Sequence, residues 1–307
     1  MNKRLILPAV LALVCIPAAR AEDAKFEAAK RAIVARIAAS GADVAVIFRT
    51  LDGKTAWSVR ADEKFHAAST MKVAVMIELY RQAREGKLRL ADLLPLKNEF
   101  HSIVDGSVYS LSAGDDSESE LYKAVGQTRR IDELCELTIT VSSNLATNML
   151  IEKLGVENIQ ATVRALHAEG MDVLRGVEDT KAFEKGLNNT TTADGLATLL
   201  MAIAQGKAVD AAASEQMAAV LKRQKWNEGI PAGLPPGIEV AHKTGEITNI
   251  HHDAGIVYAR VPFVLVILVR GIPDSKVSAA LIADITRELY LSTQQDHLPD
   301  TGPHRKE

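Results

Sequence analysis

The sequence predicts a mixed α/β fold: an antiparallel five-stranded sheet with flanking helices, built from both ends of the chain, and an all-α domain between them. Stretches rich in β-branched residues lie near the two ends, at 43–50, 55–59 and 237–271. Between residues 66 and 225, Ala, Leu and Met recur instead at the three- and four-residue steps of helices. Strands that flank a helical insert bury their apolar faces by pairing into one sheet, so the two ends are expected to meet.

The N-terminus has the pattern of a secretory signal peptide over residues 1–21. A basic start is followed by the apolar run 5–16 and by a small-x-small cleavage site at 19–21. We therefore expect a mature chain that begins at Glu22 and is exported to a bacterial periplasm. No later stretch of the sequence is long and apolar enough to span a membrane, so stable membrane insertion is not expected.

The remaining elements follow in order along the mature chain. A helix is expected at 24–40, and the Asp-Gly pair at 52–53 predicts the tight turn of the first hairpin. Three strands and a closing helix are expected near the C-terminus. The predicted domains are the sheet domain (22–65 and 226–291), the helical domain (66–225) and a polar, disordered tail (292–307). A cleft between two such domains is a preferred place for a small-molecule site.

The charge and the cysteine content argue against two features: nucleic-acid binding and an intramolecular disulfide. The net charge is −3 and no basic stripe is present, which argues against nucleic acid as a partner. Once the signal peptide is removed, Cys135 is the only cysteine, so an intramolecular disulfide is excluded and the hydrophobic core must provide the stability.

Ser69 and Lys72 stand three residues apart at the start of a predicted helix. A serine hydroxyl needs a base within hydrogen-bond reach to act as a nucleophile, and positions i and i+3 share a face of a helix. A helix N-terminus also offers free N–H groups for an oxyanion. The pair is equally compatible with a helix cap beside a solvated lysine. By itself it does not decide between the two.

Two later segments carry further polar groups. The segment 142–144 (Ser-Ser-Asn) lies between two predicted helices, where it serves either as an N-cap or as a proton carrier with an amide for substrate. The segment 243–245 (Lys-Thr-Gly) lies in a predicted strand, where the glycine marks either a bulge or the close approach of another backbone or a ligand. A lysine and a threonine at that place could hold a carboxylate.

Together, the motifs S-x-x-K, S-x-N and K-T-G occur in the order and on the elements of class A β-lactamases and penicillin-binding proteins. The mature chain resembles this superfamily of penicillin-recognising serine hydrolases over nearly its whole length. The resemblance implies a monomeric serine β-lactamase that hydrolyses a small-molecule β-lactam through an acyl-enzyme on Ser69, with no cofactor and no metal. The alternative is a D-alanyl-D-alanine peptidase or a slow-turnover penicillin-binding relative.

The resemblance also implies a role for each motif residue. Ser69 attacks the lactam carbonyl, and the backbone N–H groups of Ser69 and Glu246 hold the oxyanion. Lys72 and Ser142 pass a proton to the departing nitrogen. The substrate is bound by Asn144 at its side-chain amide and by the segment Lys243, Thr244 and Gly245 at its carboxylate.

The base that releases the acyl group is less clear from the sequence. Glu178 follows Arg175 at a position similar to that of the base in the family, but Ala182 stands where an asparagine is usual. Glu184 has its asparagine, Asn188, but lies very close to the next strand. We prefer Glu178 as catalytic base, with Glu184 as the alternative. Lys72, Glu178 through a water, or both would take the serine proton.

Three further features differ from the family or suggest another site. Ser143 stands where class A enzymes usually carry aspartate. In the insert 100–127, Tyr109 could line the cleft rim, and the acidic run is interpreted as a solvated loop, with calcium binding as the alternative. The polar run 251–253 (His-His-Asp) invites a metal site, but adjacent strand residues point to opposite faces, so we expect none.

Overall fold

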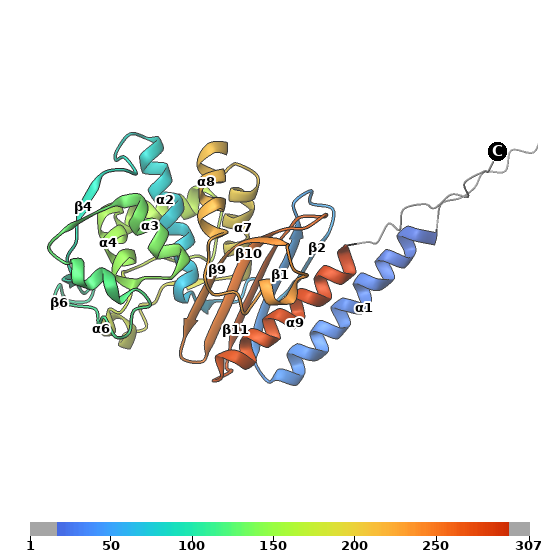
Figure 1. The fold of residues 1–307 in the computed structure, drawn as a ribbon. Helices are drawn as coiled ribbons and strands as arrows, with labels where there is room; N and C mark the ends of the chain where they lie inside the picture. Colours follow the sequence, from blue (N-terminus) through green and yellow to red (C-terminus); the bar gives the residue numbers. More distant parts are fainter. Residues whose placement is uncertain (1–16, 295–307) are drawn as a thin grey trace, which may run out of the picture.

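The computed structural model describes residues 17–294 of the 307-residue chain (Figure 1). Residues 1–16 of the predicted signal peptide and 295–307 of the predicted tail lie outside the described residues. Within residues 17–294, no helix is long and apolar enough to cross a membrane.

Five antiparallel strands form the main sheet, and both ends of the chain contribute to it. The order is β2 (Ala56–Val59), β1 (Asp43–Thr50), β11 (Phe263–Arg270), β10 (Ile250–Tyr258) and β9 (Glu239–Ile247). The predicted fold class is therefore confirmed. The turn between β9 and β10 is tight, and its Asn249 adopts a φ of 61°.

The sheet is buried on both faces, which explains the continuous apolar runs of its central strands. On β1, Val46 and Phe48 face a cluster that includes residues of α1 (Pro17–Ser40) and α9 (Ser275–Thr293). The alternate residues Ala45 and Ile47 join the larger core shared with the helical half. Figure 1 shows α1 and α9 side by side across one face, with the helical half beyond the other.

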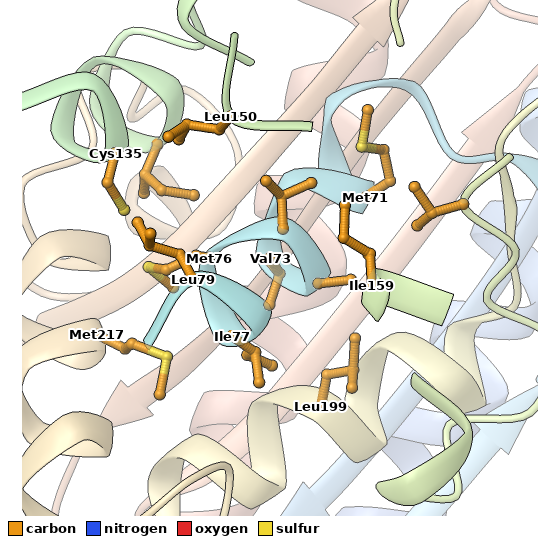
Figure 2. Close-up of a cluster of buried hydrophobic side chains, with 14 of the residues drawn as sticks. Met71, Val73, Met76, Ile77, Leu79, Cys135, Leu150, Ile159, Leu199 and Met217 are labelled. Carbon is orange, nitrogen blue, oxygen red and sulfur yellow. The ribbon is translucent and has the colours of Figure 1, made fainter. Parts of the chain in front are cut away.

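Helix α2 (Lys72–Arg84) is the centre of the helical half. Its side chains are buried around almost the whole helix, against Cys135, Leu150, Leu199 and Met217 of four other helices (Figure 2). The other elements of this half are η1 (Ala68–Met71), η2 (Ser119–Ala124), α3 (Ile131–Thr140), α4 (Asn144–Leu154), α5 (Val156–Ala165), α6 (Thr180–Glu184), α7 (Ala193–Ala204) and α8 (Ala211–Leu221). Short strand pairs complete it: β3 (Phe65–His66) with β8 (Thr190–Thr191), β4 (Leu93–Pro95) with β7 (Thr128–Arg130), and β5 (Phe100–His101) with β6 (Val108–Tyr109). The 3₁₀ turn η3 (Pro231–Gly233) packs on α9 instead.

Candidate active site

Ser69 lies in the 3₁₀ turn η1, immediately before α2 and beside strand β9. In a 3₁₀ turn, positions i and i+3 eclipse one another, so the turn keeps Ser69 and Lys72 on the same side. Ala68, the residue before Ser69, has a φ of 45°, a strained conformation for a residue with a side chain. The nucleophile candidate is therefore held in a constrained backbone on top of the most buried helix.

Lys72 is fully buried, and its ammonium is held by the loop 142–144. Its Nζ donates to the carbonyl oxygen of Ser142 at 2.8 Å, to Ser142 Oγ at 3.1 Å and to Asn144 Oδ1 at 3.0 Å. Burial lowers the pKa of Lys72 to about 7, against the opposing effect of nearby carboxylates. Near neutral pH, a substantial fraction of Lys72 is therefore unprotonated and able to accept a proton.

The Ser142 hydroxyl lies between two buried lysines. Lys243 Nζ donates to Ser142 Oγ at 3.1 Å, the same distance as Lys72 Nζ. Burial, and then the charge of Lys72, lower the pKa of Lys243 well below its usual value. Ser143 rather than Ser142 caps α4, since its Oγ accepts from the backbone N–H of Ala146. The N-cap of this segment is therefore Ser143, and the Ser142 hydroxyl contacts the two lysines instead.

Strand β9 is one of the two edge strands of the sheet and passes directly beside η1. A Cβ on Gly245 would lie 3.1 Å from the backbone nitrogen of Ser69 and 3.1 Å from Thr70 Cγ2. The glycine of the K-T-G segment thus marks the close approach of η1, where a larger residue would be crowded, as its position in a strand suggested. Its neighbours Thr244 and Glu246 line the cleft.

Two connected cavities form the cleft, with volumes of about 830 and 620 Å³. Four residues line both of them: Ser69, Asp115, Asn144 and Glu246. The larger cavity extends from this junction toward α9, and the smaller one runs along the loop at 175–183. Ser69 therefore stands where a ligand that occupies both cavities would cross from one to the other.

Glu178 faces the smaller cavity, whereas Glu184 does not line it. Asn144 Nδ2 donates to Glu178 Oε1 at 2.6 Å, so the amide of Asn144 joins Glu178 to Lys72. Desolvation raises the pKa of Glu178 against the hydrogen bond from Asn144, and the carboxylates of Asp116 and Asp115 raise it further. Glu184 is the exposed last residue of α6. Of the two candidates, Glu178 is the one beside the other motif residues.

Polar side chains hold the Glu178 loop in place. Asn148 of α4 binds both sides of Val177, accepting from its N–H at 2.6 Å and donating to its carbonyl at 3.0 Å. The buried guanidinium of Arg175 donates to the carbonyl of Leu187 at 2.8 Å and to Asn188 Oδ1 at 3.0 Å. Asn188 therefore ties the two ends of the loop together. The sequence did not single out Asn148, although it lies four residues after Asn144 on the same helix.

Of two expectations about the insert 100–127, one is wrong and the other holds only in part. Tyr109 supports the Glu178 loop and does not line the cleft: its hydroxyl donates to the carbonyl of Val177 at 3.3 Å, and it packs on Phe100. Asp115 lies at the cleft instead. The acidic run is not simply a solvated loop, because the Asp116 side chain is buried, with 8% of its surface exposed, and accepts hydrogen bonds from the start of α4.

The polar run on β10 is divided between the two faces of the sheet, as adjacent strand residues require. His252 is buried, and its Nε2 lies 2.9 Å from the carbonyl oxygen of His66. Burial lowers the pKa of His252 to about 4. Asp253 lies 2.9 Å from His242 Nδ1 on the opposite face, and His251 lines the larger cavity. These three side chains therefore do not converge on one point.

Comparison with known proteins identifies the family. The family model described as "Beta-lactamase enzyme family" matches residues 28–292. A curated relative, beta-lactamase AST-1 of Nocardia asteroides, is 30% identical over 240 residues, which cover 74% of this chain and 72% of the relative. The chain belongs to the beta-lactamase enzyme family.

Solved structures show the same fold. A beta-lactamase from Sphaerobacter thermophilus superimposes with a TM-score of 0.72 at 25% identity, over 85% of this chain and 95% of that one. The structure of PBP-A superimposes with a TM-score of 0.69 at 25% identity, over 82% and 89% of the two chains. The resemblance inferred from the three motifs is thereby confirmed.

Proposed function

We propose that this member of the family is a serine hydrolase that opens the β-lactam amide through an acyl-enzyme on Ser69. One observation carries the proposal. The Ser142 hydroxyl lies 3.1 Å from each of two fully buried lysine amines, beside the serine at the junction of the cleft. Two buried lysines that share a hydroxyl are costly for the fold, and such costs are concentrated where the groups act on a ligand.

Acylation begins with attack of Ser69 Oγ on the lactam carbonyl. The proton of the hydroxyl passes to Lys72, or to Glu178 through a water. Lys72 is suited to this step because its lowered pKa of about 7 leaves it partly neutral. The backbone N–H groups of Ser69 and Glu246 hold the oxyanion, and each such donor typically contributes about 3 kcal/mol.

The departing lactam nitrogen then receives a proton. Lys72 and Ser142 supply it, with Ser142 as the relay, since its hydroxyl already contacts the amine. Lys243 and Thr244, beside Gly245, bind the substrate carboxylate. Asn144 binds the side-chain amide of the substrate. Because its own side-chain amide also contacts Glu178, it aligns Glu178 with the bound substrate.

Release of the product requires an activated water. Glu178 is the proposed base, because it faces the cleft and contacts Asn144 at 2.6 Å. A positioned base of this kind typically contributes 10²- to 10⁴-fold to the rate, roughly. The carboxyl must be ionised, and its raised pKa keeps it a stronger base than a free glutamate.

The experiment is incubation with benzylpenicillin, followed by absorbance and by intact-mass measurement. Rapid turnover without a retained adduct supports a β-lactamase. A stable adduct on Ser69 instead supports the alternative, a peptidase or a slow penicillin-binding relative. Ser69→Ala should show neither turnover nor adduct. No reaction of the wild-type protein with any penicillin would contradict the acyl-transfer proposal.

We further propose export and a monomeric state. The signal-peptide pattern of residues 1–21 predicts cleavage before Glu22, and β-lactams act outside the cytoplasm. N-terminal sequencing of the periplasmic protein should begin at Glu22, and light scattering during gel filtration should give the mass of one chain.

A further inference from the structure

Asp116 is a buried carboxylate that the acylation steps do not use. It belongs to the insert 100–127 and accepts hydrogen bonds from another part of the chain. Its Oδ2 accepts from the backbone N–H groups of Asn144 and Leu145, both at 2.9 Å, and from the hydroxyl of Tyr122 at 2.9 Å. Ser143 Oγ contacts the same oxygen at 3.3 Å. Its other oxygen accepts from the N–H of Glu118 at 3.0 Å.

These contacts place Asp116 directly behind the catalytic groups. The residue whose N–H it holds, Asn144, uses its side chain to contact Lys72 Nζ at 3.0 Å and Glu178 Oε1 at 2.6 Å. The first N–H groups of a helix have no partner within the helix, and a carboxylate there both satisfies them and opposes their partial positive charge. A shift of Asp116 would therefore move the side-chain amide of Asn144, which joins Lys72 to Glu178.

We propose that Asp116 is a positioning residue for acyl transfer: from the insert, it fixes the loop 142–144 and provides a negative charge that acts on Lys72. The proposal rests on the proposed function for its kinetic consequences, but its geometry and its effect on Lys72 do not depend on that function. The insert is then part of the active site and not only a surface loop.

The charges around Lys72 define the expected effect. Asp116 and Glu178 favour the protonated form of Lys72, whereas burial of the amine disfavours it. Asp116 exerts the larger effect of the two carboxylates on the pKa of Lys72. Removal of this negative charge must lower that pKa further, whichever group accepts the serine proton. A helix cap without an electrostatic role would leave it unchanged.

The first test is Asp116→Asn, which keeps the shape of the side chain and removes its charge. The titration midpoint of Lys72, followed by NMR of ¹³C-labelled lysine, should fall by about one pH unit. The matching inflection in the pH profile of benzylpenicillin acylation should move down equally. Asp210→Asn is the matched control, because Asp210 also caps a helix, through the N–H of Ala213, but lines neither cavity. It should leave both midpoints unchanged.

The second test moves the carboxylate to the neighbouring position. Because Ser143 Oγ lies 3.3 Å from Asp116 Oδ2, the double variant Ser143→Asp/Asp116→Asn places a carboxylate close to the original one. It should return the titration midpoint of Lys72 to within about 0.3 pH unit of the wild-type value. That difference is small beside the shift of about one pH unit expected for Asp116→Asn alone. Ser143→Asp alone puts two carboxylates together and should lower the Tm. If Asp116→Asn does not fold, the double variant decides: it must fold and titrate near wild type.

The results that overturn the proposal are specific. An unchanged Lys72 midpoint in Asp116→Asn, or a double variant that fails to restore it, would show that Asp116 is only a structural cap. If the wild-type protein does not react with penicillin, the proposed function fails, but the NMR midpoints still test Asp116. The two failures are therefore distinguishable.

Discussion

The two walls of the cleft are built in different ways. The serine wall consists of η1, the start of α2 and strand β9, with the apolar core directly beneath it. The loop wall, which carries Glu178, is irregular from 174 to 189 except for the five-residue helix α6. Side-chain hydrogen bonds from Asn148, Arg175 and Asn189 hold it in shape.

This difference indicates which of the two steps, acylation or release of the acyl group, is more easily impaired by mutation. To displace Ser69 or Lys72, the protein would have to disturb a helix packed on all sides, whereas the loop depends on a few hydrogen bonds. Backbone strain is present on both walls: Ala68 on the serine wall and Glu178 on the loop wall have positive φ, at 45° and 63°. We therefore expect acylation to be robust and release of the acyl group to be sensitive to small changes.

The largest effect should follow from Glu178→Gln, which keeps the loop wall but removes its base. Turnover of benzylpenicillin should fall by roughly 10²- to 10⁴-fold, the usual contribution of a general base. Glu184→Gln is the matched control, since Glu184 is exposed on α6, and its steady-state kinetics should equal those of the wild type. The reverse pattern would assign the base to Glu184.

Asn148→Ala should loosen the loop wall while leaving the serine wall intact. It removes two hydrogen bonds to Val177, the residue before Glu178, so the base is no longer held at its place. Deacylation should slow by about 10- to 100-fold, and acylation by less than about threefold. Stopped-flow measurement separates the two steps. Asn158→Ala is the control, because among residues 17–294 its side-chain amide donates only to the carbonyl of Leu154, and equal effects of both variants would contradict the comparison.

Lys72→Met tests how far the burial of this lysine lowers the free energy of unfolding. Lys72 titrates near 7 in the folded protein and at its ordinary value of 10.5 when unfolded. Between these values the unfolded chain binds more protons, so the free energy of unfolding rises with pH, by about 1.4 kcal/mol per unit. Urea denaturation from pH 7 to 8.5, a window within that range, should show a smaller rise for Lys72→Met. An identical slope would mean that Lys72 stays protonated in the fold.

The smallest effect should come from Gly245→Ala. The added Cβ would lie 3.1 Å from the backbone nitrogen of Ser69, so η1 and β9 must separate by a few tenths of an ångström. Since misplacement by about 1 Å typically costs 10²-fold, kcat/KM should fall by about three- to tenfold. Unchanged kinetics would show that η1 and β9 can accommodate the added methyl group without displacing Ser69.

The serine wall could be predicted from the sequence, whereas the support of the loop wall could not. The S-x-x-K and K-T-G motifs fix the elements that carry Lys72 and Lys243, and the β-branched runs at both ends predict the sheet. Asp116 was not identified, since a carboxylate in an acidic run has the pattern of a solvated side chain and its partner Asn144 lies 28 residues away. The expectation for Tyr109 is wrong for a different reason, because only the fold decides which side of the Glu178 loop this side chain faces.

The direct test of separable walls is the mass of Glu178→Gln after rapid mixing with benzylpenicillin and an acid quench. We predict that the whole population gains the mass of one penicillin, on the peptide that contains Ser69, while the wild type in the same experiment shows no lasting adduct. A Glu178→Gln protein that turns over as fast as wild type without an adduct would contradict the account. A variant that no longer acylates at all would contradict the independence of the two walls, and it would assign the serine proton to Glu178 and not to Lys72.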